Sequence, residues 1–280
     1  MTVPRIRLND GTEIPALGYG TWQLDEGAVP EALGAALDAG YRHIDTAHAY
    51  GNEAAIGRVI ADADIARDEL WITSKLWNDR HGRDATLRAF DGTMERLGLD
   101  VLDLYLIHWP VPMEDKYAES WQAMVELREQ GRIRSIGVSN FEPDHIDRIV
   151  GETGVVPSVD QIELHPRYQQ RDIRDTLAAR DIRIESWSPL GQGEIMSDPT
   201  IARIAETHGK SPAQVILRWH LDQGLIVFPK STSPDHIRSN MDVFDFALDA
   251  EQTAAIDALD AADGKMGPKP SELGPIPLSE

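Results

Sequence analysis

The feature that most constrains the fold is a regular alternation of short apolar runs with longer amphipathic segments along the chain. The short runs predict strands and the segments between them predict helices. The predicted strands are Ala16–Gly20, His43–Thr46, Leu70–Lys75, Leu102–His108, Ile133–Ser139, Val159–Glu163, Arg183–Ser186 and Leu225–Phe228. Strands that alternate with helices predict a parallel sheet.

Helix ends between these strands are marked by glycine. A helix over Pro30–Ala39 is expected to end at Gly40, and one over Asp84–Leu97 at Gly98. Eight strand–helix units in 280 residues fit a single (β/α)8 barrel of the TIM type, which needs about 250 residues. No linker, repeat or low-complexity run divides the chain, so one domain over residues 1–280 is expected.

The two ends of the chain lie outside this alternation. Arg5–Pro15 has Asn-Asp-Gly at its centre and predicts an N-terminal β-hairpin, within residues 1–15, at the bottom of the barrel. Residues 264–280 contain four prolines and predict a C-terminal loop or tail. An open doubly wound sheet is the alternative architecture, but no Gly-x-Gly-x-x-Gly motif follows a strand, which argues against it.

The net charge and the lack of cysteine limit the ligands that the chain can bind and the chemistry that it can carry out. With 27 basic and 47 acidic residues, the net charge of −20 repels nucleic-acid backbones and anionic membranes. The absence of cysteine excludes disulfides, thiol nucleophiles and cysteine-bound zinc, and fits a reducing cytoplasm. No signal peptide or membrane span is predicted. We therefore expect a cytoplasmic protein in which any anionic ligand binds at a local basic island.

Polar side chains stand at the ends of three consecutive predicted strands. Asp45 ends the second strand and is followed by Tyr50, Lys75 ends the third, and His108 ends the fourth. Each has an ordinary alternative role, as a helix cap, a packed ring, a solvated charge or a hydrogen-bonded core residue. In a (β/α)8 barrel the active site lies at this face, and the joint occurrence of all four predicts a catalytic pocket.

The four side chains suit the reduction of a carbonyl group. Negative charge develops on the carbonyl oxygen as hydride arrives at carbon, so that oxygen needs a proton donor. Tyr50 is the expected donor, because the charge of Lys75 lowers the pKa of a neighbouring phenol. Asp45 would pair with Lys75, and His108 would orient the carbonyl oxygen.

Aromatic side chains in the same loops suggest where the substrate binds. Trp22, Trp77 and Trp109 predict an apolar wall, although each alone is as well explained by packing. Lys265 and Lys269 in the tail would favour an acidic substrate, unless they are simply solvated. Small aldehydes, dicarbonyls and keto-sugar acids all remain open as substrates.

Five motifs carry a resemblance to a known family. They are Gly40–Ala47 (GYRHIDTA), Leu104–Pro110 (LYLIHWP), Ile136–Phe141 (IGVSNF), Gln161–Pro166 (QIELHP) and Val227–Ser231 (VFPKS). In this order they closely resemble the aldo-keto reductase family, over about residues 18–263. Three further stretches, Lys75–His81, Glu185–Gly193 and Asp242–Phe246, look most like bacterial 2,5-diketo-D-gluconic acid reductases.

The resemblance implies a monomeric barrel that binds NADPH and reduces carbonyl compounds with the tetrad Asp45, Tyr50, Lys75 and His108, all present here. It also implies the contacts with NADPH. The matching positions are Thr21 and Trp22 in the first loop, Ser139, Asn140 and Gln161 for the carboxamide, Trp187 for the nicotinamide ring, Ser188, Leu190 and Gly191 for the pyrophosphate, Lys230, Ser231 and Thr232 for the 2′-phosphate, and His236 and Asn240 for adenine.

One position departs from the family pattern. His236 stands where many relatives that prefer NADPH carry an arginine, and a neutral imidazole gives up most of the charge and the two-pronged phosphate contact. Arg238 lies close by in the sequence and is a possible substitute. The resemblance therefore implies a narrower preference for NADPH, with NADH usable.

Two other functions are weighed against the reductase. Some barrels of this lineage bind the nucleotide as regulatory subunits, with little turnover. A barrel hydrolase would use Glu163 and Glu185 as its acid and base, although both have ready structural roles. No cluster of residues with metal-ligand spacing is found, so no metal is expected.

Overall fold

The computed structural model describes residues 3–278, and eight of its strands form one parallel sheet that follows the chain order from β3 to β10. These strands are β3 (Tyr19–Gly20), β4 (His43–Asp45), β5 (Trp71–Leu76), β6 (Leu102–Ile107), β7 (Ile133–Ser139), β8 (Val159–Glu163), β9 (Arg183–Trp187) and β10 (Ile226–Val227). All eight predicted strands are present.

The sheet closes between its first and last strands. Leu17 and Val227 form a parallel bridge, in which Gly18 N donates to Val227 O at 2.7 Å and Val227 N donates to Ala16 O at 2.9 Å. This bridge replaces a regular ladder, which is why β3 and β10 are shorter than predicted. The predicted barrel is confirmed, and the open sheet is excluded.

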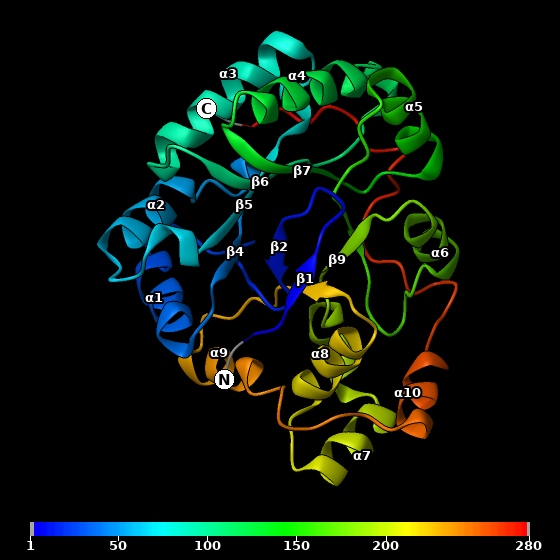
Figure 1. The fold of residues 1–280 in the computed structure, drawn as a ribbon. Coiled ribbons are helices and arrows are strands. Elements are labelled where there is room, and N and C mark those ends of the chain that lie inside the picture. Colours follow the sequence, from blue (N-terminus) through cyan, green and yellow to red (C-terminus); the bar gives the residue numbers. More distant parts are fainter. Residues whose placement is uncertain (1–2, 279–280) are drawn as a thin grey trace.

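Helices surround the barrel on its outside (Figure 1). They are α1 (Val29–Ala39), α2 (Glu53–Asp62), α3 (Arg83–Leu97), α4 (Tyr117–Glu129), α5 (Pro143–Thr153), α6 (Arg171–Ala179), α7 (Pro199–His208), α8 (Pro212–Asp222), α9 (Pro234–Met241) and α10 (Ala250–Asp257). The predicted ends of α1 and α3 are confirmed, because Gly40 and Gly98 adopt left-handed φ values of 102° and 66°. No helix of the described residues is both long and apolar enough to cross a membrane.

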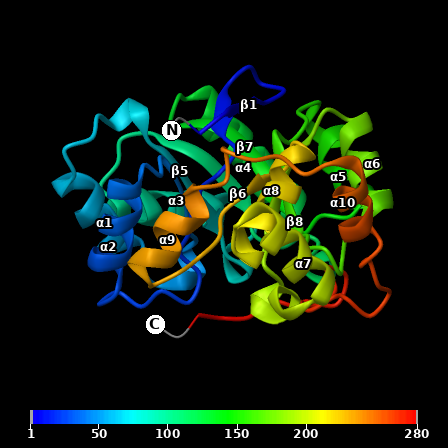
Figure 2. The same cartoon turned by 90° about the horizontal axis from the view of Figure 1, so that it is seen from below.

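A hairpin of β1 (Arg5–Arg7) and β2 (Glu13–Pro15) closes the bottom of the barrel, as predicted. Its buried Leu8 and Ile14 pack in one cluster with residues at the start of strands, such as Trp71 and Ile226. Figure 2 shows this hairpin on one side of the barrel and the C-terminal segment, up to residue 278, on the other. The hairpin thus leaves the opposite face free for the site.

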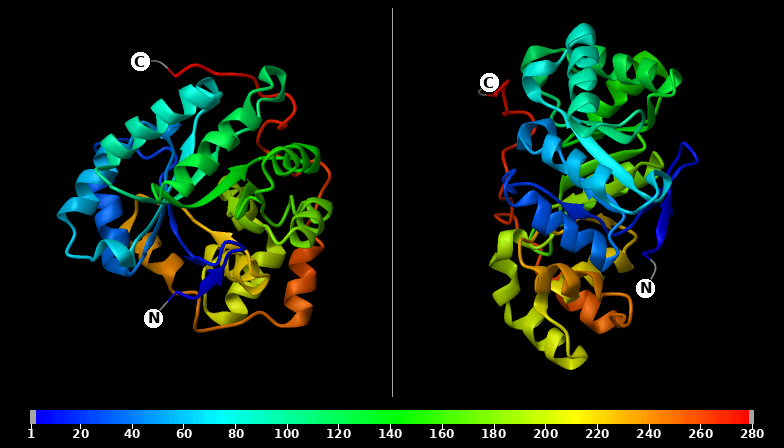
Figure 3. Two further views of the ribbon diagram at one scale, coloured as in Figure 1. Left: turned by 45° about the horizontal axis from the view of Figure 1, so that its top comes forward. Right: turned by 90° about the vertical axis from the view of Figure 1, so that its left-hand side faces the viewer.

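The segment after residue 263 forms no helix or strand up to residue 278 and runs across the carboxyl ends of the strands (Figure 3). Trp77 Nε1 donates to Ile276 O at 2.7 Å, and Asn78 Nδ2 donates to Gly274 O at 3.2 Å. The predicted tail is therefore folded back along the rim of the barrel.

Candidate active site

A cavity of about 820 Å³ opens at the carboxyl ends of the strands, beneath the C-terminal tail. Most residues predicted for the site line it. They are Trp22, Asp45, Tyr50, Trp77, His108, Trp109, Ser139, Asn140, Gln161, Trp187, Ser188, Leu190 and Lys230. The barrel therefore brings together side chains from all eight of its strands or the loops that follow them.

Lys75 lies under the floor of this cavity and is fully buried. Its Nζ donates to Asp45 Oδ1 at 2.7 Å, to Thr46 O at 2.8 Å and to Tyr50 Oη at 3.4 Å. These contacts use the three donors of an ammonium group. Proximity to Asp45 raises the pKa of Lys75 against the opposing effect of burial, so this side chain stays charged.

Tyr50 ends a short 3-10 turn, His48–Tyr50, that stops at Gly51 with a left-handed φ of 67°. Burial raises the pKa of Tyr50, and the positive charge of Lys75 opposes that rise without reversing it. The sequence alone predicts the opposite direction, a lowered pKa for Tyr50. The direction differs because a sequence does not show how deeply a phenol is buried.

His108 packs edge-on against two rings, with centroid distances of 5.8 Å to Tyr50 and 5.0 Å to Trp77. Burial, and then the charge of Lys75, lower the pKa of His108 well below its usual range. The imidazole is therefore neutral, and it can donate one hydrogen bond without carrying a charge of its own.

A second layer of polar groups lies beneath the tetrad. Gln161 Nε2 donates to Asp45 Oδ2 and to Glu185 Oε2, both at 2.8 Å. The sequence predicts Gln161 as a cofactor contact, and it offers Glu185 only as one of the two carboxyl groups of a hydrolase. The sequence does contain one signal that Glu185 lies near the site. Glu185 and Trp187 are two residues apart on one strand, so their side chains face the same side of the sheet.

The predicted nicotinamide contacts form a connected wall. Ser139 Oγ donates to Gln161 O at 2.7 Å, Asn140 Nδ2 donates to His108 O at 3.0 Å, and Trp187 Nε1 donates to Asn140 Oδ1 at 2.8 Å. Asn140 has a left-handed φ of 60°, which asparagine tolerates better than most residues. These bonds fix the orientation of the wall in advance of any ligand.

Several predicted contacts do not line the cavity. The Thr21 side chain is buried and donates to Asp45 O at 3.0 Å. The other residues in this group are Gly191, Ser231, Thr232, His236 and Asn240. His236 is exposed in the first turn of α9, and Arg238 is paired with Asp235 on the same helix.

The tryptophans and lysines suggested for the substrate fall into two groups. Trp22, Trp77 and Trp109 line the cavity, and Trp22 keeps 44% of its surface exposed at the mouth. Neither tail lysine lines the cavity, because Lys265 lies 3.5 Å from Glu163 and Lys269 lies 3.0 Å from a glutamate on the tail itself. The suggestion that these lysines bind an acidic substrate gains no support from their positions.

Glu163 and Glu185, the pair required by a hydrolase, do not line the cavity either. The Glu163 carboxylate accepts from Met266 N at 2.6 Å and from Gly267 N at 2.9 Å. Glu185 is fully buried beneath Gln161. Neither carboxyl group is placed to reach a bound sugar.

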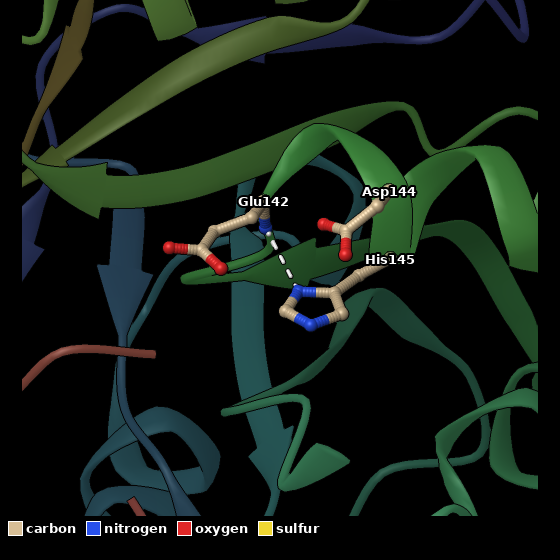
Figure 4. A group of neighbouring side chains, drawn as sticks. All are labelled: Glu142, Asp144 and His145. Atoms are coloured by element: carbon tan, nitrogen blue, oxygen red, sulfur yellow. Dashed lines mark hydrogen bonds between the residues drawn. The ribbon is translucent and has the colours of Figure 1, made fainter. Parts of the chain in front are cut away.

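One further group of acidic and histidine side chains, Glu142, Asp144 and His145, lies at the start of α5 (Figure 4). Glu142 N donates to His145 Nδ1 at 3.1 Å, and the Glu142 side chain accepts from the His145 backbone in return. This is a capping box, which accounts for the contact of Glu142 with His145.

Sequence comparison with known proteins identifies the family of this chain. The model described as "Aldo/keto reductase family" matches residues 16–261. An aldo-keto reductase of Mycolicibacterium smegmatis is 54% identical over 95% of this chain and 97% of its own length. Methylglyoxal reductase DkgA of Escherichia coli strain K12 is 47% identical, over 96% of this chain and 98% of its own length.

Solved structures agree with these sequence relatives. A point mutant of Gox0644 in complex with NADPH has a TM-score of 0.94 at 47% identity, over 98% of this chain and 99% of that chain. A Bombyx mori aldo-keto reductase in complex with NADP has a TM-score of 0.87 at 39% identity, over 93% of this chain and 94% of that chain. The predicted resemblance is confirmed, and the chain belongs to the aldo/keto reductase family.

Proposed function

We propose that this protein reduces aldehydes or ketones to alcohols with NADPH, and that Tyr50 donates the proton to the carbonyl oxygen. The observation that carries the proposal is the contact of Lys75 Nζ with both Asp45 and Tyr50, directly beside the neutral ring of His108. These groups surround one point of the cavity wall. A phenol, an ammonium and a neutral imidazole there suit an oxygen that gains negative charge.

The residues present fit a nicotinamide nucleotide. The cavity reaches from Tyr50 to Lys230, an exposed cation in a chain of net charge −20. Gln161 directs both amide hydrogens to carboxyl groups, which leaves its Oε1 to accept from a carboxamide. When bound, NADPH supplies a hydride to the carbonyl carbon. The complexes of Gox0644 with NADPH and of the Bombyx mori enzyme with NADP support this choice.

Each residue of the tetrad then has a distinct task. Tyr50 is protonated at neutral pH, as a phenol ordinarily is, and burial raises its pKa further. The protonated phenol is the form that donates. Lys75 stabilises the phenolate that remains after the transfer. Asp45 holds the ammonium in place, so that it is not left as an unpaired buried charge.

The substrate end of the cavity favours a small carbonyl compound. Trp22, Trp77 and Trp109 line it, and they exclude water from the reacting oxygen. The name of the Escherichia coli relative, methylglyoxal reductase, supports dicarbonyls as a substrate class. Keto-sugar acids remain candidates within the same proposal, although the tail lysines do not supply a cation in the cavity wall.

The test follows the loss of NADPH absorbance with methylglyoxal and a panel of aldehydes and ketones. The substitution Tyr50→Phe is expected to reduce kcat by about 10²- to 10⁴-fold, because it removes the proton donor. NADPH binding, measured by quenching of tryptophan fluorescence, should survive in the variant. If the wild type binds NADPH but turns over no carbonyl compound, a regulatory role replaces this proposal.

A further inference from the structure

Glu185 is the most unusual group near the tetrad, because it is a fully buried carboxyl that lies outside the cavity wall. It lies on β9, where its backbone pairs with that of Gln161 on β8. The Gln161 amide donates one hydrogen to Glu185 and the other to Asp45. A continuous set of contacts therefore runs from Glu185 through Gln161 to the Asp45–Lys75 pair.

The neighbour on the other side of Glu185 indicates its protonation. His43 Nδ1 lies 3.3 Å from Pro15 O, which can only accept, so Nδ1 carries the hydrogen of the neutral ring. His43 Nε2 is then an acceptor, with Thr73 Oγ1 at 3.2 Å and Glu185 Oε1 at 3.9 Å. Thr73 Oγ1 is the group close enough to donate to this lone pair, and Glu185 Oε1 has no hydrogen-bond partner among the described residues. An ionised oxygen without a donor is unfavourable in a buried site, so this geometry favours the neutral acid.

The electrostatics agree with this geometry. Burial and then the charge of Asp45 raise the pKa of Glu185 to about 8. Burial lowers the pKa of His43 to about 3, so that ring does not supply a positive charge. At neutral pH the buried groups around Gln161 therefore carry two opposite charges, on Lys75 and Asp45, and Glu185 adds none.

We propose that Glu185 is a positioning residue for the reduction: as a neutral acid it holds Gln161, and through Gln161 it fixes the Asp45 carboxylate and sets the charge around Lys75 and Tyr50. This inference rests on the proposed function. Glu185 does not touch the cavity, so it acts through its neighbours and not on the substrate.

The consequence is a defined pH dependence. The groups around Glu185 are His43 and Asp45 on β4, Lys75 on β5, and Asp160 and Gln161 on β8. When Glu185 ionises, a second negative charge beside Asp45 favours the ammonium of Lys75 and disfavours a phenolate at Tyr50. Tyr50 then stays protonated to a higher pH than it would beside a neutral group.

The test compares kcat for carbonyl reduction against pH in the wild type and in Glu185→Gln, which keeps the shape of the side chain and cannot ionise. We expect the fall in kcat at high pH to begin about half a unit to one unit lower in this variant. Oxidation of the product alcohol needs the phenolate, so its rise with pH should move in the same direction. Profiles that superimpose would overturn the inference.

Asp160→Asn is the matched control. Asp160 is also buried and its pKa is also raised to about 8, but Gln161 does not donate to it. Its profile should follow that of the wild type, and a shift as large as in Glu185→Gln would mean that any buried acid of this region has the effect. That outcome would remove the special role of Glu185.

A second readout does not depend on activity. The infrared spectrum of the wild type without cofactor should contain the carbonyl band of a protonated carboxylic acid at neutral pH, and Glu185→Gln should reduce it. If the wild type has no reductase activity, the proposed function fails. If it is active and the band is unchanged in the variant, only the role of Glu185 fails.

Discussion

Among single residues, His236 is the one that the sequence predicts to influence the choice of cofactor. It is exposed in the first turn of α9, and Lys230 is the cation that lines the cavity before that helix. A guanidinium binds a phosphate through two parallel hydrogen bonds, whereas an imidazole offers one. The Arg238 guanidinium is paired with Asp235, so it is a poor replacement.

We therefore predict that His236→Arg raises the ratio of kcat/KM for NADPH over NADH by about tenfold, mainly through a lower KM for NADPH. Steady-state kinetics with both cofactors measure the ratio. Arg238→Ala is the control and should change the ratio little. If His236→Arg leaves the ratio unchanged, His236 does not face the 2′-phosphate.

The proximity of Asp45, Lys75 and His108 could be predicted from the sequence, because the carboxyl ends of parallel strands share one face of a barrel. The hydrogen-bond partners and the burial of these groups could not be predicted from it. The contact between Gln161 and Glu185 depends on the register of β8 and β9, which the apolar pattern does not encode. The raised pKa of Tyr50 depends on its burial in the folded chain, which the residues around it in the sequence do not show.

Among larger elements, the C-terminal tail forms part of the cavity wall. Met266, Pro268 and Leu278 line the cavity, and the tail is held at both ends. The first anchor is the Glu163 carboxylate, which accepts from two backbone N–H groups. The second is the indole of Trp77, which donates to the backbone near the end of the chain.

We predict that Glu163→Gln raises KM for the carbonyl substrate several-fold and changes kcat by less than about twofold. The amide keeps one acceptor and turns an NH2 group toward backbone donors, which loosens Met266 and Gly267. Glu272→Gln is the control, since Glu272 is exposed and its carboxylate pairs with Lys269 on the same tail. A KM equal to that of the wild type would contradict the anchoring role.

The ends of the helices could be predicted from the sequence, whereas the path of this tail could not. Glycines such as Gly40 and Gly98 mark helix ends because they alone adopt left-handed backbone without strain. A segment rich in proline and glycine has no periodicity, so nothing in its sequence predicts which surface it crosses. Its contacts with Trp77 and Glu163 are visible only in three dimensions.

At the scale of the whole molecule, the free energy of unfolding depends on pH through titratable groups that are buried without charge. Burial lowers the pKa of His43 and His220 to about 3 and that of His81 to about 4. It raises the pKa of Asp160 and Glu185 to about 8. Histidine and carboxyl groups of this kind affect the free energy of unfolding in opposite directions as the pH changes.

The signs follow from which state binds more protons. Below pH about 6.5 the unfolded chain protonates its histidines while the folded chain does not, so stability falls as the pH falls. Each such histidine costs about 2 kcal/mol at pH 5. The two raised carboxyl groups remain protonated in the folded chain up to pH about 8 but ionise in the unfolded chain near pH 4, so stability falls as the pH rises between these values.

We therefore predict that the free energy of unfolding is greatest near pH 6 to 7, since the acids weaken the fold on the alkaline side and the histidines outnumber them on the acid side. Urea unfolding between pH 5 and pH 8.5 measures the curve. Glu185→Gln should lessen the loss of stability between pH 6.5 and pH 8, because the amide has no proton to lose when the chain unfolds. A curve that is flat in this range, or a variant with the same slope as the wild type, would show that Glu185 is already ionised in the folded protein.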